Sequence, residues 1–154
     1  MFGKLSLILL NWLLSKKESR VEFLPTSTKQ VDISAIRRII REKFPEGELY
    51  LSDATDYLLC SYDDIALFLA QDETNRQEYK AEHLDCDDFA LRLAGQFSIP
   101  GWSALAFGLM WTEKHALNCF ITENEELLFI EPQSDEIQDK LARWQGTQNR
   151  FILM

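Results

Sequence analysis

Cysteine and histidine, the side chains that most often do chemistry, are scarce in this sequence. Three cysteines and two histidines occur in 154 residues. An odd number of cysteines, spaced 26 and 33 residues apart, does not form a disulfide framework and favours a reducing compartment. We therefore expect a cytoplasmic protein rather than a secreted or membrane-associated one. Any chemistry that needs an imidazole has two candidates, His83 and His115.

The sequence also lacks a hydrophobic run long enough to cross a bilayer. Its longest apolar stretch, Leu5–Leu14, has about 10 residues, whereas a transmembrane helix needs ~20. Three interpretations stay open: a helix that docks on protein, a membrane-surface anchor with Trp12 at the interface, and the core of a signal peptide. The signal-peptide interpretation lacks a cleavage site of the small-x-small type, so docking on protein is favoured.

Positive charge is the minority charge. Sixteen Lys and Arg stand against twenty-five Asp and Glu, for a net charge of −9. The excess is uneven, because residues 1–44 carry nine basic and four acidic side chains and residues 45–154 carry seven and twenty-one. A negative field repels phosphate backbones, so we expect no nucleic-acid partner.

Repeats, low-complexity tracts and Gly/Ser linkers are also missing, and 46% of the residues are hydrophobic. This composition predicts one globular domain over residues 1–154. Within it we distinguish an apolar and basic N-terminal segment (1–31), a helical part (32–82), and a part with a Cys-bearing helix followed by antiparallel strands (83–154).

Hydrophobic spacing predicts the helices of the middle part. Over residues 32–44, isoleucines recur at helical spacing, Asp32 can cap the start and Pro45 ends the run. Residues 46–81 predict several helical pieces, among them 62–70, with a polar loop or exposed helix after it.

A second clear helix begins near Cys86. Phe89, Leu93 and Phe97 are spaced by four residues, which predicts one apolar helical face. Cys86 then lies in the first turn, where free backbone N–H groups favour a thiolate. Three acids in the same turn oppose that effect, namely Asp85, Asp87 and Asp88. A cationic partner would be needed to activate the sulfur.

Three apolar segments predict strands, over residues 104–111, 115–121 and 127–130. The polar stretch 122–126 is a turn between the last two, so they form an antiparallel hairpin. The start of one strand then lies beside the end of the next. His115 and Glu131 should therefore meet at one edge of the sheet, and the helix that carries Cys86 could complete a set of nucleophile, base and orienting acid.

The run Asp85-Cys86-Asp87-Asp88-Phe89-Ala90, followed by His115-Ala116, resembles the bacterial transglutaminase-like cysteine peptidases, a branch of the papain-like superfamily. The resemblance covers roughly residues 80–135. It implies an α+β, papain/transglutaminase-like fold with N-terminal helices packed on a small antiparallel sheet. It also implies Cys86 as nucleophile, His115 as general base and Glu131 as orienting acid, with no metal and no cofactor.

The sequence departs from that group at three positions, the first of which is Leu84, where the group usually has a glycine before the Asp-Cys pair. In that group the residue that orients the histidine is more usually Asp or Asn, whereas Glu131 is expected to do so here. Gln133 and Asn118 are the alternative candidates for this role. Lys80 stands where papain-like enzymes keep a glutamine as oxyanion donor. The nucleophile's own backbone N–H could be one donor, with Tyr79 as a candidate for the other.

Two functions remain. The first is a cysteine-dependent amide hydrolase or acyltransferase that acts on a peptide or amide substrate. The alternative is a catalytically silent binding or interaction module of the same fold, which docks on a protein or membrane through Leu5–Leu14; the missing glutamine and the acids around Cys86 favour it.

A metal site is the rival interpretation of the same residues. His83, Cys86, His115 and Cys119 have paired spacing like that of zinc ligands. On a strand, however, His115 and Cys119 would lie ~13 Å apart at ~3.3 Å per residue, too far to share one zinc. The three acids beside Cys86 could cap the helix or hold Mg²⁺ or Ca²⁺. Cys60 and Cys119 lie among apolar residues and are expected in the core.

Overall fold

Strands and helices contribute similar shares of the regular structure in the computed structural model, which describes residues 21, 23–53 and 55–154. The strands are β1 (Gln30–Asp32), β2 (Glu48–Tyr50), β3 (Asp56–Leu58), β4 (Phe107–Thr112), β5 (Ala116–Ile121), β6 (Leu127–Glu131), β7 (Glu136–Gln138) and β8 (Asn149–Leu153). The helices are α2 (Ile33–Lys43), α3 (Tyr62–Gln71), α4 (Cys86–Phe97) and the 3₁₀ turn η1 (Thr74–Arg76).

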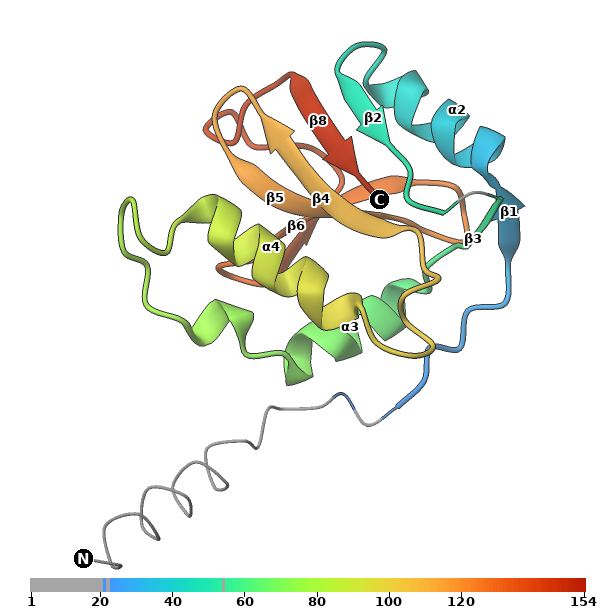
Figure 1. Ribbon diagram of the computed structural model, residues 1–154, viewed down its shortest axis with the longest axis horizontal. Helices are drawn as coiled ribbons and strands as arrows, with labels where there is room; N and C mark the ends of the chain where they lie inside the picture. Colours follow the sequence, from blue (N-terminus) through green and yellow to red (C-terminus); the bar gives the residue numbers. More distant parts are fainter. Residues whose placement is uncertain (1–20, 22, 54) are drawn as a thin grey trace, which may run out of the picture.

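Six strands form the main sheet, in the order β2-β8-β4-β5-β6-β7 (Figure 1). The pair β2–β8 is parallel and the other neighbours are antiparallel. The last strand of the chain, β8, lies between β2 and β4. The short strands β1 and β3 pair in a second sheet.

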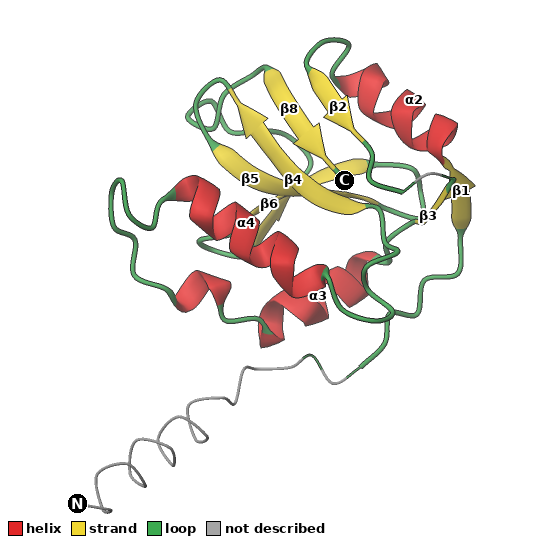
Figure 2. Ribbon diagram, in the orientation of Figure 1, coloured by secondary structure: helices red, strands yellow, loops and turns green. Residues whose placement is uncertain are grey.

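The main sheet is covered on both faces, and the alternation of its side chains creates two cores (Figure 2). Ile36, Ile39 and Ile40 of α2 share one core with Leu117, Cys119 and Ile121 of β5 and with Phe129 of β6. Residues Phe68 of α3, Leu93 and Phe97 of α4, Phe120 of β5 and Ile130 of β6 belong to the other. The strands β4 to β6 are therefore almost wholly buried.

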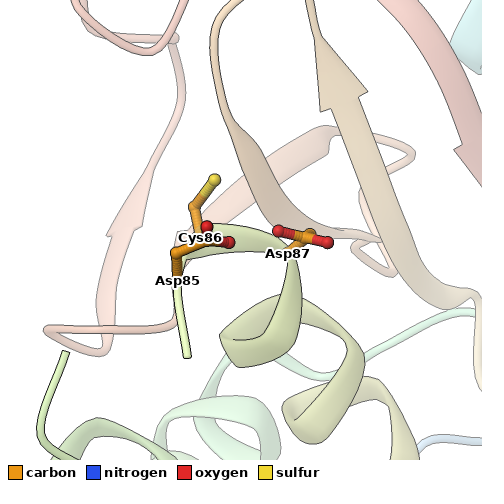
Figure 3. A group of neighbouring side chains, drawn as sticks. All are labelled: Asp85, Cys86 and Asp87. Carbon is orange, nitrogen blue, oxygen red and sulfur yellow. The ribbon is translucent and has the colours of Figure 1, made fainter. Parts of the chain in front are cut away.

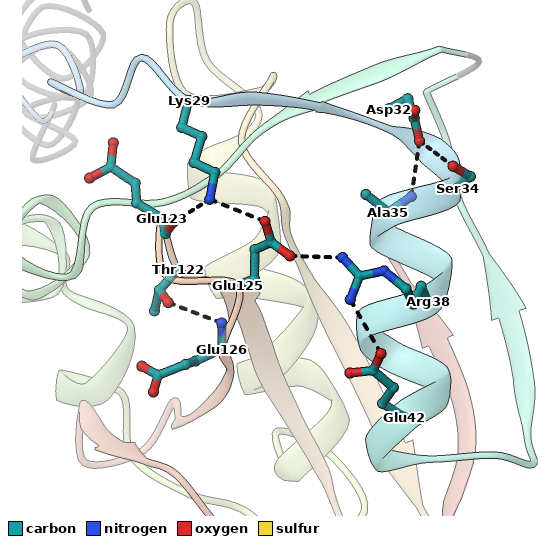
Figure 4. A network of polar contacts seen from close by, with 10 residues as sticks. All are labelled: Lys29, Asp32, Ser34, Ala35, Arg38, Glu42, Thr122, Glu123, Glu125 and Glu126. Carbon is teal, nitrogen blue, oxygen red and sulfur yellow. Dashed lines mark hydrogen bonds and ion pairs between the residues drawn. The ribbon is translucent and has the colours of Figure 1, made fainter.

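Helix α2 is capped at its start and is linked to the β5–β6 turn by an ion pair from its middle (Figure 4). The side chain of Asp32 accepts a hydrogen bond of 3.0 Å from the backbone N–H of Ala35, which confirms the predicted N-cap. Arg38 pairs with Glu125 in the β5–β6 turn at 2.7 Å, and Lys29 reaches the same carboxylate at 3.2 Å. These exposed pairs set the position of α2 more than they stabilise it.

The fold class predicted from the sequence is wrong. In place of N-terminal helices on a small antiparallel sheet, the described residues have one helix before residue 46, and the six-stranded sheet is mixed. Residues 46–58 hold β2 and β3, which were expected to be helical. The physical reason is tertiary: β2 pairs with β8, more than ninety residues away in the chain, and that pairing outweighs local preference.

The expected hairpin and the helices at 32–44, at 62–70 and from Cys86 are present. The segment Leu5–Leu14, with its predicted docking role, lies outside the described residues. Within the described part of the chain, no helix is long and apolar enough to cross a membrane.

Candidate functional site

A buried pair of His115 and Glu131 lies at one end of the main sheet. His115 comes directly before β5 and Glu131 is the last residue of β6. The hairpin brings them together as expected, because Nε2 of His115 and Oε2 of Glu131 lie 2.8 Å apart and both residues are less than a tenth exposed. Since Glu131 engages Nε2, Nδ1 is the ring nitrogen that remains for a ligand or a thiol.

Gln145 completes the surroundings of the Glu131 carboxylate. Its amide Nε2 donates to Oε2 of Glu131 at 3.0 Å, and its Oε1 accepts from the backbone N–H of Ala142 at 2.8 Å. Burial acts to raise the pKa of the Glu131 carboxyl, but the hydrogen bonds from His115 and Gln145 outweigh it and hold that pKa below its ordinary value. Glu131 is thus a buried carboxylate that contacts both His115 and Gln145.

Trp144, like Gln145, belongs to this site and was missed by the sequence analysis. Its indole packs edge-on against the His115 ring with centroids 4.9 Å apart, and the residue is 59% exposed. The buried side chain that follows it, Gln145, anchors its loop to Glu131. The available signal was a tryptophan in an otherwise polar stretch, between Arg143 and Gln145. An exposed indole at a fixed place is a platform for a ligand.

Cys86 is half-buried and is the first residue of α4, as predicted. The direction of α4 follows from two contacts. Phe97, at its end, stacks on Phe107 opposite the end of β5, with centroids 3.7 Å apart. Earlier in the helix, the carbonyl of Ala90 accepts a hydrogen bond of 2.9 Å from Nδ2 of Asn118. The start of α4 therefore lies at the end of the sheet where β5 begins and where the imidazole is found (Figure 1).

The acids beside Cys86 lie at the start of α4 (Figure 3). The ligand atoms of Asp85, Cys86 and Asp87 all lie within 4.8 Å of one another. A hydrogen bond between the two carboxyl groups raises the pKa of Asp87 and lowers that of Asp85. Asp88 accepts from the backbone N–H of Asp85 at 3.1 Å, so this acid caps the helix.

Two alternatives conflict with the structure: Asn118 in the role of Glu131, and a zinc site. Asn118 is fully buried and links α4 to the sheet, so it does not orient the imidazole. His83 is exposed, whereas Cys119 lies in the core with α2. Cys60 and Cys119 are core residues, as expected; burial raises the pKa of Cys119 to about 12 and raises that of Cys60 as well.

Several solved structures share the fold. No protein-family model and no curated protein matches the sequence. A PSL1a–E64 complex matches with a TM-score of 0.70 and 24% identity, over 81% of this chain and 51% of that one. The lectin of Polyporus squamosus, bound to the human-type influenza-binding epitope Neu5Acα2-6Galβ1-4GlcNAc, matches with a TM-score of 0.65 and 23% identity, over 81% and 49%. This chain therefore spans about half the length of each.

These matches correct the family suggested by the sequence. The resemblance to bacterial transglutaminase-like cysteine peptidases is wrong, because the fold is shared with part of a lectin chain. The assignment as a hydrolase rested on that resemblance and is therefore wrong as well. The short run around Cys86 misled because an acidic helix start and a buried His–Glu pair can serve structure as well as catalysis. The specific roles of Cys86, His115 and Glu131 stay a prediction.

Proposed function

We propose that this chain is a non-catalytic binding module and that the surface around Trp144 binds a carbohydrate. The observation that carries the proposal is the half-exposed indole, held edge-on against a buried imidazole. The shared fold with a lectin chain supports the ligand class. The ligand thus differs from the peptide or amide substrate expected from the sequence.

The surface around Trp144 suits a sugar for physical reasons. One face of a pyranose ring carries a row of C–H groups, which pack well on an indole, while its hydroxyl groups need polar partners. Nδ1 of His115, on the ring that the indole contacts, is such a partner, and Glu131 fixes that ring through Nε2. Because Gln145 ties the Trp144 loop to the same carboxylate, the indole is positioned before a ligand arrives.

A glycan panel tests the proposal. The panel includes Neu5Acα2-6Galβ1-4GlcNAc and the same oligosaccharide without its sialic acid, and is probed with the wild type and with Trp144→Ala. The wild type should bind at least one glycan, and Trp144→Ala should weaken that binding about tenfold or more, as expected for a central aromatic contact.

Tyr50→Ala is the matched control, because Tyr50 is similarly exposed (53%) but lies on β2, an edge strand of the main sheet. It should bind as the wild type does. A wild type that binds no glycan of the panel, or a Trp144→Ala variant that binds unchanged, would overturn the proposal.

A further inference from the structure

A second cluster of polar side chains lies where α3 ends and β6 turns into β7. Asp72 caps the end of α3, Thr74 and Asn75 follow in η1, and Asp135 lies in the β6–β7 turn. Nδ2 of Asn75 donates to Oδ2 of Asp135 at 2.6 Å, and the backbone N–H of Thr74 donates to Oδ1 of Asp72 at 2.8 Å. The two chain segments thus meet through oxygen-bearing groups.

Three oxygen atoms of this cluster are buried without a hydrogen-bond partner. They are Oγ1 of Thr74, Oδ1 of Asn75 and Oδ1 of Asp135. Among the described residues, six buried side-chain atoms are unpartnered in this way, and half of them belong to these two adjoining segments. Thr74 itself is fully buried. Each such atom is costly in a protein interior, which indicates that something else satisfies them together.

The cluster also has an excess of negative charge. Asp72 and Asp135 supply two carboxyl groups, and Arg76 of η1 pairs with Glu73 at 3.0 Å. Asp72 is 5% exposed. A single water molecule would donate hydrogen bonds to two of the three oxygens and would leave the repulsion between the carboxylates in place.

We propose that Asp72, Thr74, Asn75 and Asp135 bind a hard divalent cation of the Ca²⁺ class. Carboxylate, hydroxyl and amide oxygens are the ligands that Ca²⁺ prefers, and its flexible coordination of six to eight oxygens leaves room for water as well. The ion would satisfy the three unpartnered oxygens and neutralise the two carboxylates. It would also join η1 to the β6–β7 turn.

This site differs from the group Asp85, Cys86 and Asp87. Those acids are only half-buried, and they lie at a helix start, where carboxylates serve the helix without an ion. The turn of the proposed site begins at Glu131, whose carbonyl accepts from the backbone N–H of Asp135 at 2.9 Å. A bound cation would therefore stiffen the segment that follows Glu131. The cation proposal does not depend on the glycan proposal.

Calorimetric titration of the full chain with CaCl₂, after treatment with EDTA, tests the cation site. The wild type should bind Ca²⁺, and its Tm should rise by roughly 5 to 10 °C at a hundredfold excess over Kd. Asp135→Asn should lose this shift, and should be more stable than the wild type in EDTA because a buried repulsion is gone. Thr74→Val, which keeps the shape of the side chain, should weaken Ca²⁺ binding about tenfold.

Asp87→Asn is the control and should bind Ca²⁺ as the wild type does. An absence of binding heat and of any Tm shift in the wild type would overturn the proposal. So would Ca²⁺ binding that survives in both Asp135→Asn and Thr74→Val, or that is lost in Asp87→Asn. If Asp135→Asn fails to fold, Thr74→Val alone decides.

Discussion

Glu131 has the central position in the candidate site, because three different segments of the chain meet at its carboxylate. His115 precedes β5, Gln145 belongs to the loop before β8, and Gln133 follows in the β6–β7 turn, with a backbone N–H at 3.4 Å. A buried charge of this kind is tolerated only because it is paired and hydrogen-bonded. The position of the exposed Trp144 depends on the Glu131 carboxylate, because Trp144 packs on His115 and is followed by Gln145, and both of these residues contact Glu131.

Glu131→Gln tests this role. The substitution keeps the shape but removes the charge, so the free energy of unfolding at pH 7 should fall by about 1–3 kcal/mol, measured by urea denaturation. Because hydrogen bonds hold the pKa of Glu131 below its ordinary value, the stabilisation is present above about pH 4.5 and is lost as pH falls through the lowered pKa. The difference between variant and wild type should therefore shrink toward pH 3. A difference that is constant with pH would contradict the account.

Glu125→Gln is the matched control at a surface position. Glu125 pairs with Arg38 and Lys29, but these side chains are 35% to 52% exposed. Exposed ion pairs of this kind contribute about 0–1 kcal/mol to the free energy of unfolding. The control should therefore change the free energy of unfolding much less than Glu131→Gln does.

Among the elements, those with a strong local signal could be predicted from the sequence. α2 has isoleucines at helical spacing and an aspartate N-cap, and the β5–β6 hairpin has two apolar runs with a short polar turn between them. The strands β2 and β3 have three residues each, too few for a period to appear. The position of β8 between β2 and β4 is decided by long-range pairing, which no local pattern encodes.

Two glycines test how closely the elements approach. At Gly108 of β4, an added Cβ would lie 2.1 Å from the backbone oxygen of Leu153 in β8, so Gly108→Ala should force the two strands apart and destabilise by about 1–3 kcal/mol. At Gly95 of α4, an added Cβ meets nothing within 4 Å. Gly95→Ala should stabilise by roughly 0.5–1 kcal/mol through helix propensity.

Thermal and urea unfolding of the two variants measure these effects. Equal stability of Gly108→Ala and the wild type would contradict the β4–β8 pairing. Destabilisation by Gly95→Ala would contradict the exposed position of that glycine on α4.

At the scale of the whole molecule, the sequence placed His115, Glu131 and the start of α4 at one end of a sheet but assigned the wrong family. The spatial relation followed from hairpin geometry, which is local and general. The family did not, because a short motif around Cys86 is compatible with unrelated functions on one fold. Trp144 escaped notice because its partner, His115, is 29 residues away and only the folded chain brings them into contact.

The rate at which iodoacetamide alkylates Cys86 at pH 7 tests the non-catalytic account most directly. Mass spectrometry would locate the label, and the fully buried Cys60 and Cys119 are internal controls that should stay unlabelled in the folded chain. The account predicts that Cys86 reacts no faster than the cysteine of an unstructured peptide, and equally fast in His115→Ala. Much faster alkylation that is lost in His115→Ala would contradict it, because that result shows a thiol activated by the imidazole.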